Sequence, residues 1–254
     1  EMWEKQAAPR LKERSRGTVI ISRTFKTIGL GEAAVGEQVS SLFGQENPYL
    51  GIYARQDGIH LRIISKAPTE DEARSLMEPM EAEINATLGS AIWGVDDETP
   101  EERVGTLLQQ KGLTMAAMES CTGGLLASVV TDVPGSSSYF KGSLVTYATE
   151  VKSIAGVDPE LIKEHGVVSS RVSEAMAEAV RDGLNADVGI GITGVAGPGP
   201  SEGIPAGTVY VGVSMNGITR STEMRFPPNR PLVKRRAVVQ ALLLTFSTIL
   251  EMSA

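Results

Sequence analysis

The spacing of hydrophobic and polar positions in the first hundred residues changes several times between strand-like and helix-like patterns, which predicts a small α+β unit. Residues 18–29 are rich in β-branched and apolar side chains, which predicts a strand, and the helical spacing of residues 31–43 predicts a helix after it. The alternating runs 51–55 and 59–65 are joined by Gln-Asp-Gly, and an Asp-Gly pair supplies the positive φ of a tight turn. These two runs therefore predict a β-hairpin.

A longer helix and a short strand complete this unit. Thr69 is expected to cap a helix that Gly89 closes, because acidic residues follow Thr69 and apolar positions then recur at helical spacing. Residues 91–95 predict the last strand, and the acidic, proline-containing residues 96–102 follow it. The order of strand, helix, two strands, helix and strand indicates an α+β domain over residues 18–98.

The remaining residues, 99–254, alternate helical and strand patterns in the manner of a three-layer α/β/α sandwich with a mixed sheet. Asn216 and Gly217 are expected to form the turn of a hairpin within it, since Asn-Gly favours positive φ. The predicted elements, in order, are helix 100–111, strand 113–118, helix 122–131, strand 142–147, helices 150–155, 159–165 and 171–184, strand 188–193, strands 208–215 and 218–226, and a final helix from Pro231.

Composition and charge narrow the class of protein. The chain has 254 residues, 41% of them hydrophobic, and its apolar runs fall short of the roughly 18 residues that a membrane helix needs. The N-terminal residues lack the apolar core of a secretory signal, so we expect a cytoplasmic protein. A net charge of −7, with no basic excess in either half, argues against a nucleic-acid partner. One cysteine and two histidines provide neither a disulfide nor a zinc site, so no metal is expected. Magnesium held by carboxylates stays open as the alternative.

The segment ESCTGG contains the first candidate for catalysis. Ser120 follows a predicted strand and precedes two glycines that open a predicted helix, so its oxygen is expected near unpaired backbone N–H groups. Such N–H groups, around residues 121–124, suit a developing oxyanion. Alternatively, Ser120 or Thr122 is simply a helix N-cap. Cys121 is a second possible nucleophile, although a small buried thiol is its commoner role.

An activating group for a serine lies in the segment VTYATEVK. Tyr147 at a strand end and Lys152 one turn into the next helix can reach over the same sheet edge, which would supply a lysine base and a tyrosine relay. A lysine base must be partly desolvated so that its pKa falls toward neutrality. Without that, Lys152 is an ordinary solvated side chain. His165 offers a serine–histidine–acid alternative, but its place in the last turn of a short helix indicates pairing with the helix end.

Two further segments predict ligand contacts. Residues 191–207 follow a buried strand with six glycines and three prolines, and such a loop lets the backbone approach a ligand closely. Thr193 at its start could donate to a substrate, and the alternative is a long connection that needs glycine for its turns. Residues 224–240 gather basic side chains near a helix start. Arg230 is the candidate for binding phosphate there, because arginine grips phosphate bidentately, and the other charges fit a solvated helix face.

Six segments follow one another in the order and spacing of the CinA family, so that residues 100–252 resemble that family. The segments are AMESCTGG, VTDVPGSSSYFKGSLVTYATEVK, HGVVS, GITGVAGPG, GTVYVGV and RFPPNR. This region is similar to the domain that occurs alone in nicotinamide-nucleotide amidases of the PncC type, and residues 18–98 resemble the KH-like middle domain of full-length CinA proteins. The resemblance implies that an upstream molybdopterin-binding-like domain is missing, with residues 1–17 as its end or a remnant linker.

The resemblance implies a hydrolase of pyridine nucleotide salvage, an amidase that converts nicotinamide mononucleotide to nicotinate mononucleotide and ammonia. Carried over by position, its catalytic residues are Ser120, Lys152 and Tyr147. The substrate-binding residues that the motifs imply are Thr122, Gly123, Gly124, Ser136, Thr193, Gly194, Gly197 and Arg230. The resemblance implies a homodimer. The serine mechanism needs no cofactor, and the short apolar runs argue against a membrane partner.

Two other functions stay open at this point. The pocket could bind a nucleotide without turning it over, and the intact Ser120, Tyr147 and Lys152 argue against that. The KH-like domain could bind RNA, but it lacks a basic GxxG clamp. The loop sequence GPGPSEG also departs from the commoner glycine-rich continuation in the family, which leaves its ligand contacts open.

Overall fold

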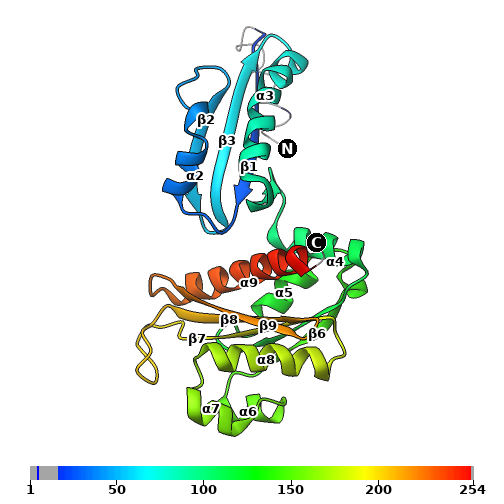
Figure 1. Ribbon diagram of the computed structural model, residues 1–254, viewed down its shortest axis with the longest axis vertical. Helices are drawn as coiled ribbons and strands as arrows, with labels where there is room; N and C mark the ends of the chain where they lie inside the picture. The colour runs from blue at the N-terminus through cyan, green and yellow to red at the C-terminus, as the bar shows by residue number, and fades with distance from the viewer. Residues whose placement is uncertain (1–4, 6–16, 253–254) are drawn as a thin grey trace. The chain divides into compact units, whose positions relative to one another are not determined.

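The computed structural model describes residue 5 and residues 17–252, and the chain folds as two compact units that divide after Glu98 (Figure 1). The remnant predicted at residues 1–17 falls, apart from its residues 5 and 17, outside the described residues. Each unit has its own sheet and its own core.

The first unit is built on a four-stranded antiparallel sheet in the order β2-β3-β1-β4, with the predicted succession of strands and helices. Its elements are β1 (Val19–Thr27), α2 (Glu32–Gln38), η2 (Ser40–Leu42), β2 (Tyr49–Arg55), β3 (Gly58–Ala67), α3 (Glu70–Leu88), η3 (Gly89–Ala91) and β4 (Ile92–Val95). Thr69 caps α3 as expected, since its hydroxyl accepts the N–H of Glu72 at 3.2 Å. Gly58 closes the β2–β3 hairpin at φ +129°, where a Cβ atom would lie 1.8 Å from the Thr27 carbonyl oxygen.

The core of this unit lies between α3 and the sheet. The buried face of α3 carries Met77, Met80 and Ile84, which belong to one cluster with Leu61 and Ile63 of β3. Helical spacing on α3 and alternation on β3 therefore direct apolar side chains into the same layer.

The second unit is a three-layer sandwich around a five-stranded sheet in the order β6-β5-β7-β8-β9. Strands β6, β5 and β7 are parallel, whereas β8 and β9 continue the sheet antiparallel, so the predicted mixed sheet is confirmed. Helices α4, α5 and α9 cover one face, and α8 lies on the other with α6 and α7 beyond it (Figure 1). The elements are α4 (Pro100–Lys111), β5 (Met115–Glu119), α5 (Leu125–Thr131), η4 (Ser136–Ser138), β6 (Phe140–Val145), α6 (Thr149–Ile154), α7 (Pro159–His165), α8 (Ser170–Gly183), β7 (Val188–Gly194), β8 (Thr208–Met215), β9 (Ile218–Arg225) and α9 (Arg230–Met252).

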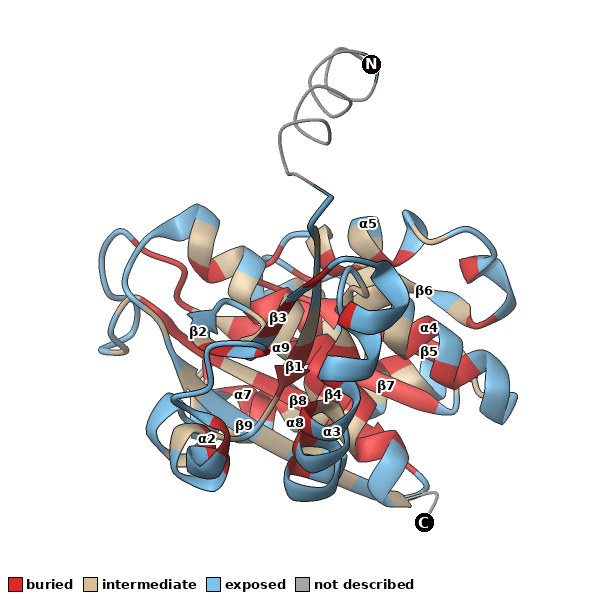
Figure 2. Ribbon diagram, turned by 90° about the horizontal axis from the view of Figure 1, so that it is seen from above, coloured by how far each residue is buried: buried red, intermediate tan, exposed pale blue. Residues whose placement is uncertain are grey.

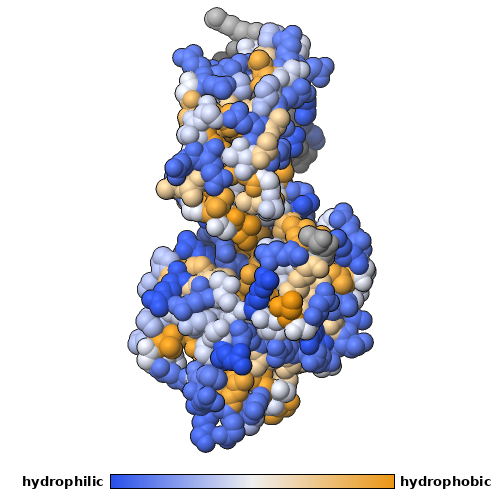
Figure 3. All heavy atoms as spheres, in the orientation of Figure 1, coloured by the Kyte–Doolittle hydropathy of each residue, from blue (hydrophilic) through white to orange (hydrophobic). Residues whose placement is uncertain are grey.

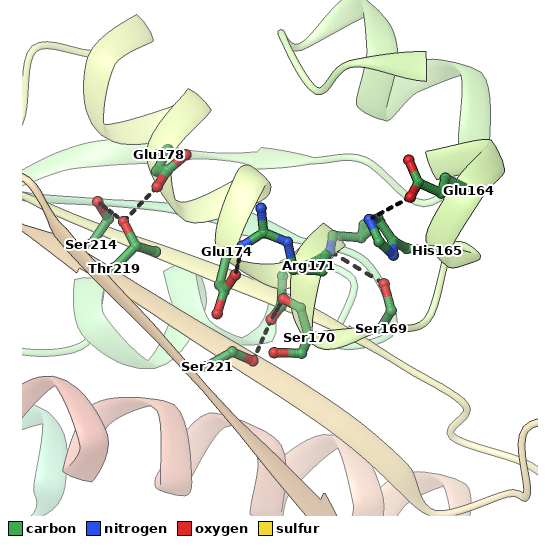
Figure 4. Close-up of polar contacts among 12 residues, drawn as sticks. Glu164, His165, Ser169, Ser170, Arg171, Glu174, Glu178, Ser214, Thr219 and Ser221 are labelled. Carbon is green, nitrogen blue, oxygen red and sulfur yellow. Dashed lines mark hydrogen bonds and ion pairs between the residues drawn. The ribbon is translucent and has the colours of Figure 1, made fainter. Parts of the chain in front are cut away.

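Helix α8 lies unusually close to the sheet because glycines face it. A Cβ atom added at Gly191 or at Gly212 would lie 2.2 or 2.3 Å from the carbonyl oxygen of Ser173. Polar contacts then join α8 to β8 and β9: Thr219 donates to Glu178 at 2.6 Å and shares a hydrogen bond of 2.9 Å with Ser214 (Figure 4). Glycines in β7 and β8, together with the hydrogen bonds of Thr219, thus keep α8 packed closely against the sheet that contains β7.

The predicted start of α5 is wrong by three residues. The helix begins at Leu125, not at residue 122, because Gly123 and Gly124 have φ of +63° and +88°, which a right-handed helix cannot contain. The carboxylate of Glu119, at the end of β5, accepts the N–H groups of Leu126 and Ala127 at 3.0 Å each. The buried Glu119 carboxylate thus binds N–H groups at the start of α5, which the sequence analysis expected to be unpaired.

Burial is highest in β5, β7 and β8 (Figure 2). The visible faces of both units are mostly hydrophilic, with scattered apolar residues (Figure 3). No helix within residues 17–252 combines the length and the apolar composition that crossing a bilayer requires.

Candidate active site

The candidate nucleophile lies where the parallel strands end. Ser120 directly follows β5, and its N–H donates to the carbonyl of Ile192 in β7 at 2.9 Å. On the other side, the N–H of Thr146, which directly follows β6, donates to the carbonyl of Glu119 at 2.8 Å. The carboxyl ends of three neighbouring strands therefore meet at Ser120, which is the edge of an open α/β sheet where ligands bind.

Lys152 comes to the same point from α6. Its side chain has no exposed surface, and its Nζ atom lies 3.1 Å from the Ser120 Oγ atom and 2.7 Å from the Thr146 carbonyl oxygen. Burial lowers the pKa of the Lys152 amine, against the opposing negative charges of Glu202 and Glu150. The alternative of a solvated surface lysine is therefore wrong, and the desolvation that a lysine base requires is present.

Cys121 is not equipped to act as the nucleophile. The thiol is 6% exposed, and burial, reinforced by the charge of Glu119, raises the pKa of Cys121 to about 12. The thiolate is the reactive form of cysteine, so a thiol with this pKa stays protonated and inert at neutral pH. Between the two adjacent candidates, the environment favours Ser120.

Tyr147 belongs to the mouth of the site instead of its interior. Its side chain is 58% exposed, and its hydroxyl accepts a hydrogen bond of 2.6 Å from Arg230, at the start of α9. Arg230 also donates to the carbonyl of Gly197 in the glycine-rich loop at 2.9 Å. The Tyr147 hydroxyl makes no hydrogen bond to Lys152 or Ser120, and Tyr147 and Gly197 together orient the Arg230 guanidinium.

Backbone N–H groups around Ser120 are only partly available. The N–H of Gly123 donates to the Ser120 carbonyl at 3.1 Å, and Glu119 binds the first N–H groups of α5. The Thr122 hydroxyl is buried and has no partner among the described residues. The N–H groups of residues 121–122, immediately after the serine, have no such partner among the described residues and so remain available to a ligand.

A cavity of about 410 Å³ opens over Ser120, which is a size suited to a small molecule. Gly194, Gly197 and Arg230, three of the predicted binding residues, line it together with Ser120 and Tyr147. The other lining residues are Cys121, Thr149, Val167, Val168, Val195, Ala196, Pro198, Gly199, Pro200, Ser201 and Glu202.

Several residues that the sequence indicated do not line this cavity. Thr193 is buried and donates its hydroxyl to the Val167 carbonyl at 2.9 Å, so it holds the loop and does not face a ligand. His165 lies 3.8 Å from Glu164 (Figure 4). It does not line the cavity, and the side chain hydrogen-bonded to Ser120 is Lys152, which argues against the serine–histidine alternative. The remaining predicted binding residues outside the lining are Thr122, Gly123, Gly124 and Ser136.

Two functional candidates escaped sequence analysis. Glu119 lies in a strand that the sequence predicts to be buried, and nothing in the sequence marks it as functional. Its role in binding the start of α5 is seen only from the N–H groups that donate to its carboxylate. Glu202 lies in a loop that glycine and proline dominate, and its place in the cavity wall depends on the path of that loop. Among the described residues, no group of three or more His, Cys, Asp or Glu side chains is arranged to hold a metal.

Each of the two units matches a known family model. A family model described as the CinA C-terminal domain matches residues 97–249, and one described as the damage-inducible protein CinA KH domain matches residues 22–94. A Moorella thermoacetica protein named for competence-damage induction is 41% identical over 251 residues, which cover 98% of this chain and 61% of that protein. A CinA-like protein of Synechocystis is 43% identical over 217 residues, which cover 84% of this chain and 52% of the relative. The chain thus spans between half and two thirds of these relatives.

Solved structures match the second unit. The crystal structure of a CinA superfamily protein from Klebsiella pneumoniae is similar with a TM-score of 0.58 and 29% identity, over 61% of this chain and 99% of that chain. A CinA superfamily protein from Escherichia coli is similar with a TM-score of 0.55 and 32% identity, over 59% of this chain and 91% of that chain. These matches confirm the predicted α/β fold class and the expected resemblance.

Proposed function

This chain belongs to the CinA family, and we propose that it hydrolyses the carboxamide of nicotinamide mononucleotide to nicotinate mononucleotide and ammonia. The observation that carries the proposal is the fully buried Lys152 amine 3.1 Å from the Ser120 hydroxyl. A lysine can replace histidine as the base for a serine only when its environment favours the neutral amine, and burial does so here.

Acylation begins at the Ser120 oxygen. The neutral Lys152 amine accepts the hydroxyl proton while Oγ attacks the amide carbon, and the contact of Nζ with the Thr146 carbonyl holds the amine in place. The oxyanion of the tetrahedral intermediate would accept hydrogen bonds from the N–H groups of Cys121 and Thr122. Each donor would lower the activation free energy by about 3 kcal/mol. Lys152 then returns the proton to the departing nitrogen, which leaves as ammonia, and an ester of Ser120 remains.

Deacylation uses the same groups in reverse. A water molecule gives a proton to Lys152 and attacks the ester carbon, after which the Ser120 oxygen recovers that proton and nicotinate mononucleotide departs. Arg230, held by Tyr147 and Gly197 at the cavity, is suited to the phosphate of the nucleotide. The glycine-rich loop around Gly197 would surround the ribose.

Ammonia release from nicotinamide mononucleotide tests the proposal. We expect release by the wild type and its loss in Ser120→Ala, whereas Ser128→Ala, an exposed serine of α5, should be unaffected. Activity that persists in Ser120→Ala contradicts the mechanism. A wild type that binds the nucleotide without releasing ammonia would indicate a binding module instead of an amidase.

A second measurement concerns metal dependence. No step of the proposed mechanism uses a metal ion, so turnover should be unchanged after prolonged incubation with EDTA. Loss of ammonia release that added Mg²⁺ or Zn²⁺ restores would overturn the metal-free mechanism.

A further inference from the structure

The cavity over Ser120 has a dipolar wall. Among the described residues that line it, only Arg230 and Glu202 carry a formal charge, and the others are apolar, glycine or uncharged polar residues. Arg230 lies at the start of α9 beside Tyr147, whereas Glu202 comes from the far part of the glycine-rich loop. A ligand that satisfies both must carry charges of both signs.

Glu202 is held in a defined position. Its carboxylate accepts the N–H of Val167 at 3.3 Å, which joins the glycine-rich loop to the segment that follows α7. Its backbone has φ of +51°, an uncommon conformation for a residue other than glycine. Its negative charge also opposes, without outweighing, the effect of burial on the pKa of Lys152. Glu202 therefore supplies a negative charge to the wall of the cavity that Ser120 also lines.

The proposed substrate has a matching charge distribution. In nicotinamide mononucleotide the carboxamide is attached directly to a pyridinium ring, so the ring's positive charge must lie beside the amide that Ser120 attacks, and the phosphate lies at the far end of the ribose. Resting on the proposed function, we infer that Glu202 is a specificity residue that recognises the positive charge of the pyridinium ring. The cavity would thereby prefer N-ribosylated pyridinium amides to neutral amides of the same shape.

A merely structural role for Glu202 makes a different prediction. If its carboxylate only secures the loop through Val167, its removal should weaken all ligands equally. Glu202→Gln separates the two roles, because glutamine keeps an acceptor for the Val167 N–H and loses only the charge. Glu202→Asp keeps the charge on a shorter side chain.

The experiment compares two ligands that differ in ring charge. Nicotinamide mononucleotide has a cationic ring, and its 1,4-dihydro form has the same carboxamide, ribose and phosphate on a neutral ring. Calorimetric titration of the full chain carrying Ser120→Ala gives both dissociation constants without turnover. We expect the cationic form to bind about tenfold more tightly, the ratio expected for one charge pair at a partly solvated site.

The preference should disappear when Glu202→Gln is added to Ser120→Ala, and should persist in part with Glu202→Asp. The matched control is Glu160→Gln, an exposed carboxylate on α7 outside the cavity lining, which should leave both dissociation constants unchanged. Equal weakening of both ligands by Glu202→Gln, an unchanged preference, or no binding of the cationic form to Ser120→Ala would each overturn the inference. Ammonia release by the wild type tests the proposed function separately, so the two can fail independently.

Discussion

The Nζ atom of Lys152, in a side chain with no exposed surface, lies 3.1 Å from the Oγ atom of Ser120, although 32 residues separate them. Strand β6 and the start of α6 bring the two together, and the Thr146 carbonyl fixes the amine. A buried amine beside a hydroxyl has few functions in a stable fold, because burying a charged lysine is unfavourable. The proposed mechanism gives this pair the roles of nucleophile and base.

The first prediction concerns the charge state of Lys152. Lys152→Arg should abolish ammonia release although it keeps the positive charge, because a guanidinium does not deprotonate in proteins. Lys152→Met should also be inactive, whereas Lys163→Met, an exposed lysine of α7, should retain turnover. The melting temperatures of the variants show whether they fold. Substantial turnover by a folded Lys152→Arg enzyme would exclude lysine as the base.

The pH dependence follows from the lowered pKa of Lys152. Only the neutral amine can accept the serine proton, so kcat should be high above that pKa and fall as the pH drops through it. Because burial lowers the pKa of Lys152 below the ordinary lysine value of 10.5, the acidic limb should lie below pH 10.5. Glu202→Gln should move this limb to lower pH, since the charge of Glu202 raises the pKa of Lys152. A limb that does not move would mean that Lys152 does not control it.

Measuring kcat and KM separately distinguishes a substrate-binding role of Tyr147 and Arg230 from a role in proton transfer. Tyr147→Phe removes a hydrogen bond to Arg230, so we expect a higher KM for nicotinamide mononucleotide and an unchanged kcat. Arg230→Gln should raise that KM by about 10-fold to 100-fold, the loss of one charge-assisted contact, and should spare the phosphate-free riboside. A fall in kcat for Tyr147→Phe, with KM unchanged, would instead support the proton relay.

Cys121 should be chemically silent. With a pKa of about 12 and 6% exposure, its thiol should resist iodoacetamide at pH 8 in the folded protein, and alkylation should appear only after denaturation. Intact-mass spectrometry reads this directly, since Cys121 is the chain's one cysteine. Cys121→Ala should retain ammonia release. Rapid alkylation of the native protein, together with loss of activity in Cys121→Ala, would instead support the Cys121 thiol as the nucleophile.

The close approach of α8 to the sheet predicts opposite effects of two glycine substitutions. Gly191→Ala would place a Cβ atom 2.2 Å from the Ser173 carbonyl oxygen, and such overpacking should destabilise the second unit by about 2 kcal/mol. Gly183→Ala, at the end of α8 with open space around it, should stabilise the unit by up to about 1 kcal/mol. Calorimetric melting temperatures should shift in opposite directions. Equal melting temperatures would mean that α8 moves away from the sheet without cost.

Much of the local structure could be predicted from short stretches of sequence. Asn216 and Gly217 form the β8–β9 turn with φ of +51° and +76°, and Thr69 caps α3, as their residue types indicated. The start of α5 could not be predicted correctly, because Gly123 and Gly124 adopt positive φ and the first bound N–H groups of the helix donate to the buried carboxylate of Glu119. A glutamate in an apolar strand shows no sign of that partner in the sequence.

The sequence by itself determined the periodicities, turns and caps, and through family motifs it determined the order of segments that surround Ser120. These features depend on sterics and hydrogen bonds within a few residues. Only the tertiary structure decided that Lys152 is desolvated, that Tyr147 pairs with Arg230 across 83 residues, and that Glu202 lines the cavity. Desolvation and charge pairing arise from groups brought together when the sheet and its loops close, and no local pattern of residues specifies them.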